Sequence, residues 1–256
     1  MEMRAWLEIS RCSNLPTVWS NVAAGMAWGW HASMVAGRDH PNFLAYRPVL
    51  DVWTLFNNAF VLMVAASLLY TGGMLLNDAF DAELDAGERP GRPIPSGRIA
   101  RRTAFGVGGL MLLLGLMACV PYAGSPWTLP LAVGIATLIV AYNALHARFS
   151  LATLGVPLCR GLLAFLAAMT IAGGAWGPTW VAGLHGTALF VFVLIISLWA
   201  RGEVPAGRAS RVGLALSTIA LVDATILAAV GQWPIAGFCL ACFAMAWAAQ
   251  SMVRGS

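Results

Sequence analysis

The sequence predicts an all-α membrane protein, a polytopic bundle of about eight transmembrane helices that forms one domain over residues 1–256. Hydrophobic residues make up 59% of the chain and charged residues 10%, whereas a soluble domain carries about a quarter charged residues. The apolar residues also form long runs, and a membrane-crossing helix needs about 20 such residues. Polar side chains are too few to cover this chain in water, so we expect a bilayer to surround it.

Each predicted helix is an apolar run bounded by polar, glycine or proline residues. The runs lie near residues 14–32, 54–76, 103–121, 127–145, 152–173, 179–199, 212–230 and 234–252. They cover most of the chain and leave no room for a separate soluble domain. Cys239 and Cys242 form a CxxC pair inside the last run, where cysteine behaves as a small hydrophobic residue, so we expect them to bind no metal.

The basic residues predict the orientation, because cytoplasmic loops of membrane proteins carry an excess of Arg and Lys. All 15 basic residues are arginines, and most fall on one side if the N-terminus is cytoplasmic, including those of the loop 77–102. The turns near 124, 176 and 232 carry no charge. We expect an integral protein of a bacterial inner membrane, with its active-site loops in the cytoplasm and no nucleic-acid partner.

A few polar residues lie apart from these loops. Asp223 falls inside the run 212–230, and we interpret it as a hydrogen-bonding residue, although acids within membranes are often functional. His31 and His185 lie near outer helix ends, where we expect an interfacial role. The outside segment 33–53 is long enough for a short interfacial helix.

The densest group of charges is NDAFDAELDAGERPGRPIPSGR, residues 77–98. If the preceding helix continues, Asn77, Asp81 and Asp85 share one face and Asp78 lies at its edge. Carboxylates gathered in this way repel one another unless a cation compensates them. Oxygen donors suit Mg²⁺, which completes its shell with water and substrate phosphate oxygens. The segment therefore predicts a metal and diphosphate site.

The alternative interpretation of this segment is a solvated loop whose acids cap helices and neutralise nearby arginines. Two features favour the binding site. The acids directly follow a membrane helix, and prolines in RPGRPIPSGR fix the backbone and prevent the helix from continuing.

The motif N-D-x-x-D-x-x-x-D followed by R-P-I-P-S-G resembles the first signature of the UbiA superfamily of intramembrane prenyltransferases. Three further segments are similar to family elements in the same order, and the resemblance covers nearly the whole chain. These segments are RCSNLPTVWSN with Arg11, Asn14 and Pro16, then YNALH from Tyr142 to His146 with histidine where lysine is usual, and GVPLCRGLL with Arg160 and Gly161.

The resemblance implies a helical bundle around a central cavity that opens to the lipid. It also implies Mg²⁺-dependent transfer of a prenyl group from a polyprenyl diphosphate to an aromatic or other small acceptor. The implied metal ligands are Asn77, Asp78, Asp81 and Asp85. The resemblance implies that Asp78 and Asp81 are catalytic, and we expect Arg201 to act with them. The resemblance implies diphosphate contacts from Arg89 or Arg92, and we expect Arg160 and Arg208 to add to them. The cavity residues that we expect are Asn14, Tyr142 and His146.

The chain departs from the family where the second Asp-rich motif should lie. It has SLWARGEVPAGR there, with Glu203 as the acid, and this shape resembles the divergent EboC-like branch. One hypothesis is a one-metal-plus-arginine site, in which Arg201 supplies the positive charge of the second metal. Another is a binding or carrier protein for the processing or export of secondary metabolites. An unrelated transporter would also give eight spans, but the sequence lacks the internal repeat typical of such folds.

Overall fold

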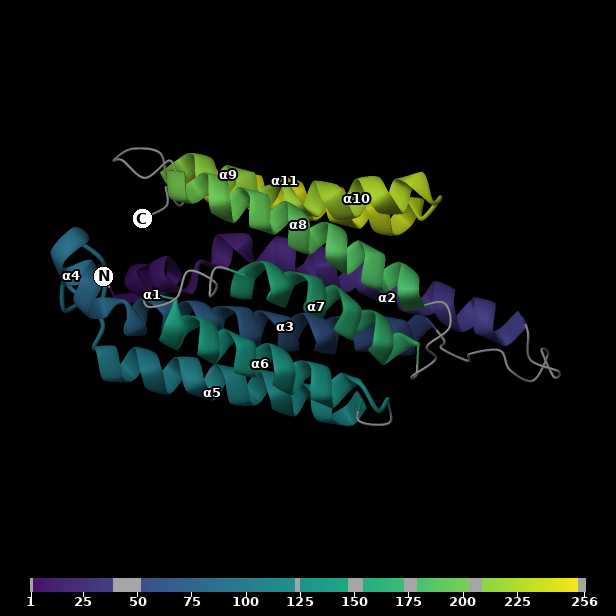
Figure 1. Ribbon diagram of the computed structural model, residues 1–256, viewed down its shortest axis with the longest axis horizontal. Coiled ribbons are helices and arrows are strands. Elements are labelled where there is room, and N and C mark those ends of the chain that lie inside the picture. Colours follow the sequence, from purple (N-terminus) through teal and green to yellow (C-terminus); the bar gives the residue numbers. More distant parts are fainter. Residues whose placement is uncertain are drawn as a thin grey trace.

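The computed structural model describes residues 2–38, 52–122, 125–146, 154–172, 179–202 and 209–252. The helices that form the bundle run side by side along the longest axis of the molecule (Figure 1). These are α2 (Leu15–Arg38), α3 (Val52–Phe80), α5 (Arg101–Cys119), α6 (Thr128–Leu145), α7 (Gly155–Ile171), α8 (Trp180–Gly202), α9 (Ala209–Ser217), α10 (Ile219–Ala229) and α11 (Trp233–Met252). The short ones are α1 (Glu2–Ser10), η1 (Cys12–Asn14), α4 (Ala82–Glu88) and η2 (Val120–Tyr122).

Every predicted membrane run coincides with a long helix, and α9 and α10 together occupy the seventh run. Among the described residues, six helical segments are long and apolar enough to cross a membrane. Helix α7 is also apolar but has only 17 residues. The predicted fold class, a polytopic helical membrane bundle, is confirmed. Of the predicted interfacial segment, residues 33–38 continue α2, and residues 39–51 lie outside the described ranges.

Tryptophans mark one end of the bundle. Trp53, Trp127, Trp180 and Trp233 lie at or next to the first residues of α3, α6, α8 and α11, and each is exposed. These four helices begin at the same end in Figure 1, opposite α1 and α4. Because Trp side chains concentrate at membrane–water interfaces, this end is expected to lie at one membrane surface. Large apolar side chains on α5 and α8, such as Leu113 and Ile195, are exposed between the two ends, as lipid contact requires.

Helix α7 is the central helix, since most of its residues are buried and it packs against α2, α6 and α8. Glycines allow this close approach. A Cβ atom added at Gly25 or Gly29 of α2 would overlap the backbone of α7. A Cβ atom at Gly186 of α8 would lie 2.8 Å from the carbonyl oxygen of Gly161 in α7. Small residues at helix contacts are typical of membrane bundles, because apolar helices there gain contact energy from close packing.

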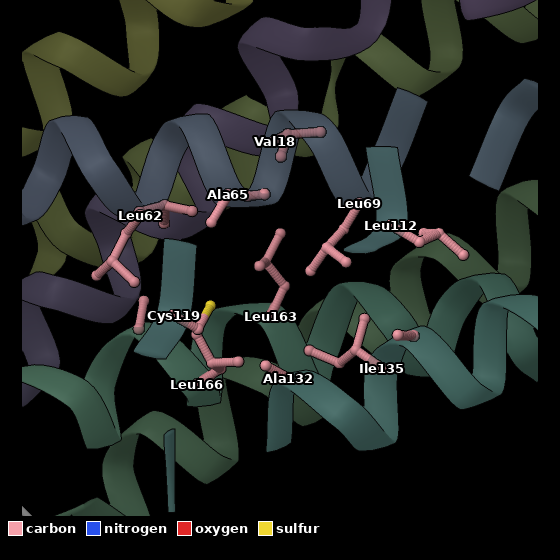
Figure 2. Close-up of a cluster of buried hydrophobic side chains, with 14 of the residues drawn as sticks. Val18, Leu62, Ala65, Leu69, Leu112, Cys119, Ala132, Ile135, Leu163 and Leu166 are labelled. Atoms are coloured by element: carbon pink, nitrogen blue, oxygen red, sulfur yellow. The ribbon is translucent and has the colours of Figure 1, made fainter. Parts of the chain in front are cut away.

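A hydrophobic cluster fills the space between α2, α3, α5, α6 and α7 (Figure 2). Leu62 and Leu69 of α3 face Leu163 and Leu166 of α7 across this cluster, and all are nearly inaccessible to solvent. The cluster holds the N-terminal half of the chain around α7. It also closes the bottom of the cavity described below.

Replacement of Gly25 by Ala tests the close packing of α2 on α7. The added methyl group meets the Ala164 carbonyl oxygen, so the two helices must separate. Overpacking of this kind costs about 1–3 kcal/mol. We expect Gly25→Ala to lower the thermal unfolding midpoint in detergent.

Gly134→Ala in α6 is the matched control, because a Cβ atom there meets no neighbour within 4 Å. Ala is the better helix former by about 1 kcal/mol, so this variant should melt at or above the wild-type temperature. Equal melting of the two variants would contradict the packing described for α2 and α7.

Candidate active site

The acidic segment remains helical where α3 passes into α4. Across this junction the amide of Asp81 donates to the carbonyl of Asn77 at 2.9 Å, and that of Asp85 to Asp81 at 2.8 Å. The four-residue spacing assumed from the sequence is therefore present in the backbone. Helix α4 ends at Glu88, just before Pro90, where proline was predicted to stop it.

The side chains of the predicted metal ligands form two groups. The Asn77 amide donates to an Asp81 carboxylate oxygen at 2.8 Å. Asp78 and Asp85 share Arg92, whose Nη1 lies 2.6 Å from Asp85 Oδ2 and 3.8 Å from Asp78 Oδ1. Asn77, Asp78 and Asp85 are buried. A cationic group thus already lies between two of the predicted metal ligands.

His146 completes the surroundings of Asp81. Its Nε2 lies 2.9 Å from Asp81 Oδ1, and its Nδ1 lies 3.2 Å from the carbonyl oxygens of both Tyr142 and Asn143. Both ring nitrogens therefore lie within hydrogen-bond distance of oxygen atoms. The ring also stacks on Tyr142, with centroids 5.1 Å apart.

The donor set has the chemistry of a magnesium site, with one amide oxygen and carboxylates on successive helical turns. In the part of the chain that the structure describes, no three Asp, Glu, His or Cys side chains converge on one point. The carboxylates instead contact Arg11, Arg92 and His146. The Arg92 guanidinium, rather than a shared set of carboxylates, links Asp78 and Asp85.

Arg11, which the sequence placed in a family-like segment without a role, belongs to the site. Its Nη2 lies 3.3 Å from Asp78 Oδ1, and its side chain lines the cavity. Its backbone has φ 47° and ψ 40°, the left-handed region, where a non-glycine residue costs roughly 1–2 kcal/mol. This turn between α1 and η1 directs Arg11 toward the acidic segment. Its place in the family-like RCSNLP segment was the available signal.

Two arginines, Arg98 in the loop after α4 and Arg101 at the start of α5, link this region to neighbouring helices. Arg98 contacts Glu8 of α1 at 3.2 Å and donates to the Gly91 carbonyl at 2.6 Å. Arg101 pairs with the exposed Glu83 at 2.6 Å and donates to the last turn of α3. Arg89, predicted as a diphosphate contact, lies exposed on the same loop.

A mostly apolar cavity opens beside this cluster, with about 1050 Å³ of space including its mouth. Arg11 and Asn77 line the end near the acidic segment, and Val18 and Leu163 line the end near the hydrophobic cluster. The predicted cavity residues Asn14 and Tyr142 line it, and so does Arg160. His146, the third predicted cavity residue, is not among the lining residues, and its ring stacks on Tyr142. The guanidinium of Arg160 lies 5.3 Å from the centre of the Tyr70 ring.

The interfacial role expected for His185 is wrong. His185 is 3% exposed, and its Nε2 lies 2.8 Å from Asp223 Oδ1 inside the bundle. Asp223 has the hydrogen-bonding role that the sequence indicated, with Asn21 as a second partner at 2.7 Å. Sequence spacing could not reveal this pairing, because each residue lies on a different helix.

The predicted second half of the site is only partly within the described residues. Arg201 lies in the last turn of α8, at the end of the bundle that holds α4 (Figure 1), and its side chain lies outside the described set. Arg208 and Glu203 also lie outside the described residues.

Arg92 and Arg89 provide a matched test of the buried ion pairs. Removing one partner of a buried pair costs about 3–5 kcal/mol. The Arg92 side chain is 14% exposed, so we expect a smaller loss of about 2–3 kcal/mol for Arg92→Met, because Asp85 is left uncompensated. Arg89→Met, on the exposed surface, should melt within about 0.5 kcal/mol of the wild type. Chemical unfolding in detergent measures both, and similar losses would show that Arg92 does not compensate the cluster.

Comparisons with known proteins agree with this architecture. The model of the UbiA prenyltransferase family matches residues 34–254. A solved structure described for digeranylgeranylglyceryl phosphate synthase in membranes is similar, with a TM-score of 0.51 and 17% identity over 99% of this chain and 88% of that one. At this identity the likeness shows a shared fold.

Curated relatives named digeranylgeranylglyceryl phosphate synthase also match. The one from Methanoregula boonei is 40% identical over 36% of this chain and 32% of its own length. Those from Sulfolobus acidocaldarius and Pyrococcus horikoshii are 29% and 32% identical over 61% and 56% of this chain. The aligned part of this chain spans 32% to 46% of the length of these three relatives. With its long apolar helices, the chain is an integral membrane protein, and it belongs to the UbiA prenyltransferase family.

Proposed function

We propose that this protein is a membrane prenyltransferase that transfers a prenyl group from an isoprenoid diphosphate to a small acceptor. One observation carries the proposal: a cluster of paired carboxylates and arginines opens onto a long apolar cavity. The charged head group of the donor requires compensating cations, and its tail requires an apolar wall. The membership of the UbiA family supports this activity.

The head group is proposed to bind at the acidic segment. Asn77, Asp78, Asp81 and Asp85 would hold Mg²⁺, which supplies positive charge to the diphosphate as it leaves. The ion pairs of Arg92 with Asp78 and Asp85 support the proposal that these carboxylates bind positive charge. Arginines at the cavity mouth would complete the diphosphate contacts, since a guanidinium binds phosphate oxygens through two parallel hydrogen bonds.

The prenyl tail is proposed to lie along the cavity toward Val18 and Leu163. Tyr70 and Tyr142 present rings in the cavity wall, and the face of an aromatic ring attracts a cation. These rings would steady the allylic cation that forms when the diphosphate leaves. The name of the relatives suggests a glyceryl phosphate as one class of acceptor, and an aromatic acceptor is the other class that we propose.

The second half of the site is proposed to use arginine. Arg201 lies at the same end of the bundle as α4, where it would supply charge to the leaving diphosphate, with Arg208 as a further contact. We place this end in the cytoplasm, because arginines surround it. The bacterial inner membrane remains a sequence-based prediction.

Asp81→Ala tests the proposed metal site. Magnesium-dependent release of diphosphate is measured in detergent with a panel of prenyl diphosphates. We expect the wild type to release diphosphate with at least one donor and to stop when magnesium is chelated. Loss of one preorganised electrostatic contact reduces turnover by about 10²–10³-fold, and we expect this for Asp81→Ala. Glu83→Ala is the control, because Glu83 has a side chain that is 85% exposed and pairs with Arg101. Equal loss in both variants would contradict the proposal.

Arg201→Ala tests the one-metal-plus-arginine hypothesis in the same assay. We expect it to lose turnover as severely as Asp81→Ala, because it would supply the charge of the missing second motif. Arg102→Ala is the control, since Arg102 is exposed on the same side. Normal turnover by Arg201→Ala would end the hypothesis without affecting the first half of the site.

A binding or carrier protein is the second candidate. Its support is that Asp78, Asp81 and Asp85 already contact cationic or imidazole groups, so the cluster is compensated before any ligand arrives. Binding of a prenyl diphosphate by the wild type without magnesium-dependent release of diphosphate would decide in favour of this role.

A further inference from the structure

Four buried polar side chains form a continuous array behind the cavity wall. Arg160 of α7 donates to the Asn21 side-chain oxygen in α2 at 3.1 Å. The Asn21 amide donates to Asp223 Oδ2 in α10 at 2.7 Å, and His185 of α8 contacts Asp223 Oδ1 at 2.8 Å. Each of the four residues is at most 7% exposed. The array therefore joins four helices through one connected set of contacts.

The two ends of the array carry opposite charges and lie in different surroundings. Of its four members, Arg160 lines the cavity. Its guanidinium lies over the Tyr70 ring, and the Asn14 amide donates a hydrogen bond to the Tyr70 hydroxyl at 3.2 Å. Asp223 carries the opposite charge on the far side of Asn21. The positive end of the array thus faces the cavity, and the negative end lies in the bundle interior.

The energetic cost of this arrangement indicates a role beyond packing. An isolated buried charge costs several kcal/mol, and apolar residues of similar size often replace a buried ion pair without loss of stability. Ionisable residues within membrane bundles are correspondingly rare and tend to be functional. A compensated arginine that still reaches the cavity is suited to bind an anionic group of a ligand.

We propose that Asp223, acting through Asn21 and oriented by His185, is a positioning residue that fixes the Arg160 guanidinium in the cavity wall to bind an anionic substrate group. The anion is either the diphosphate of the donor or an acidic group of the acceptor. This inference rests on the proposed function for the identity of the ligand, and on the geometry for the coupling of the residues.

The first experiment measures coupling without any activity. Thermal unfolding in detergent is compared for Asp223→Asn, Arg160→Gln and the double variant. We expect each single variant to have a lower melting temperature than the wild type. The decrease for the double variant should be clearly smaller than the sum of the two single decreases, because the double variant leaves no uncompensated charge. Thr225→Ala is the control on the same helix, since the Thr225 hydroxyl is exposed and bonds to its own helix. Additive shifts would overturn the proposal.

The second experiment measures binding of two probes, inorganic diphosphate and glycerol phosphate, to the folded proteins. We expect Arg160→Gln and Asp223→Asn to lower the affinity for the same probe by roughly 10- to 100-fold. This loss is equivalent to one lost hydrogen bond to a charged group. The probe whose affinity falls identifies the source of the anion. Wild-type affinity for both probes in either variant would overturn the proposal.

Asp223→Glu separates positioning from stability. It keeps the carboxylate but is larger, so it should destabilise the bundle while retaining more probe affinity than Asp223→Asn. A purely structural role predicts that affinity follows stability in both variants. If the wild type releases no diphosphate but the coupling and the probe binding are present, the transferase proposal fails and this one stands.

Discussion

The described part of the bundle depends on one constraint: charge buried among apolar helices has to be compensated within the molecule. Asp78, Asp85, Arg160 and Asp223 are buried, and each contacts a partner from another segment of the chain. Because such contacts are directional, they fix the rotation of helices that apolar packing alone would leave interchangeable. The polar residues thus determine which faces of the helices enclose the cavity.

Close packing around α7 serves the same end. The glycines of α2 and α8 bring their backbones against α7, and Asn21 of α2 and His185 of α8 contact the same Asp223 carboxylate beside the helix that carries Arg160. A wider spacing would leave the Arg160 guanidinium without the Asn21 oxygen. The hydrophobic cluster of Figure 2 closes the cavity on its apolar side. The wall that holds Arg160 is therefore charged, and the closed end is apolar.

Composition and periodicity were sufficient to predict the fold class and the positions of the helices, because a bilayer imposes a minimum length and an apolar surface on each one. The acidic segment could also be read from the sequence, since its residues are local and share one helix face. The contact of Arg11 with Asp78, the place of Tyr70 beside Arg160, and the pairing of His185 with Asp223 could not. Their partners lie on other helices, and no local spacing records which helix is a neighbour. His185 was misplaced for this reason.

Helix α3 begins beside Trp53 and ends in the acidic segment, and its length relates the cavity to the thickness of the bilayer. From Trp53 to Asn77, α3 rises about 36 Å at 1.5 Å per residue. The hydrocarbon layer of a bilayer is about 30 Å thick. If the tryptophans lie at one surface, the acidic segment lies level with the lipid head groups of the other. An isoprenoid lipid would then slide sideways into the cavity with its head and tail at their usual depths, so it would never have to leave the membrane.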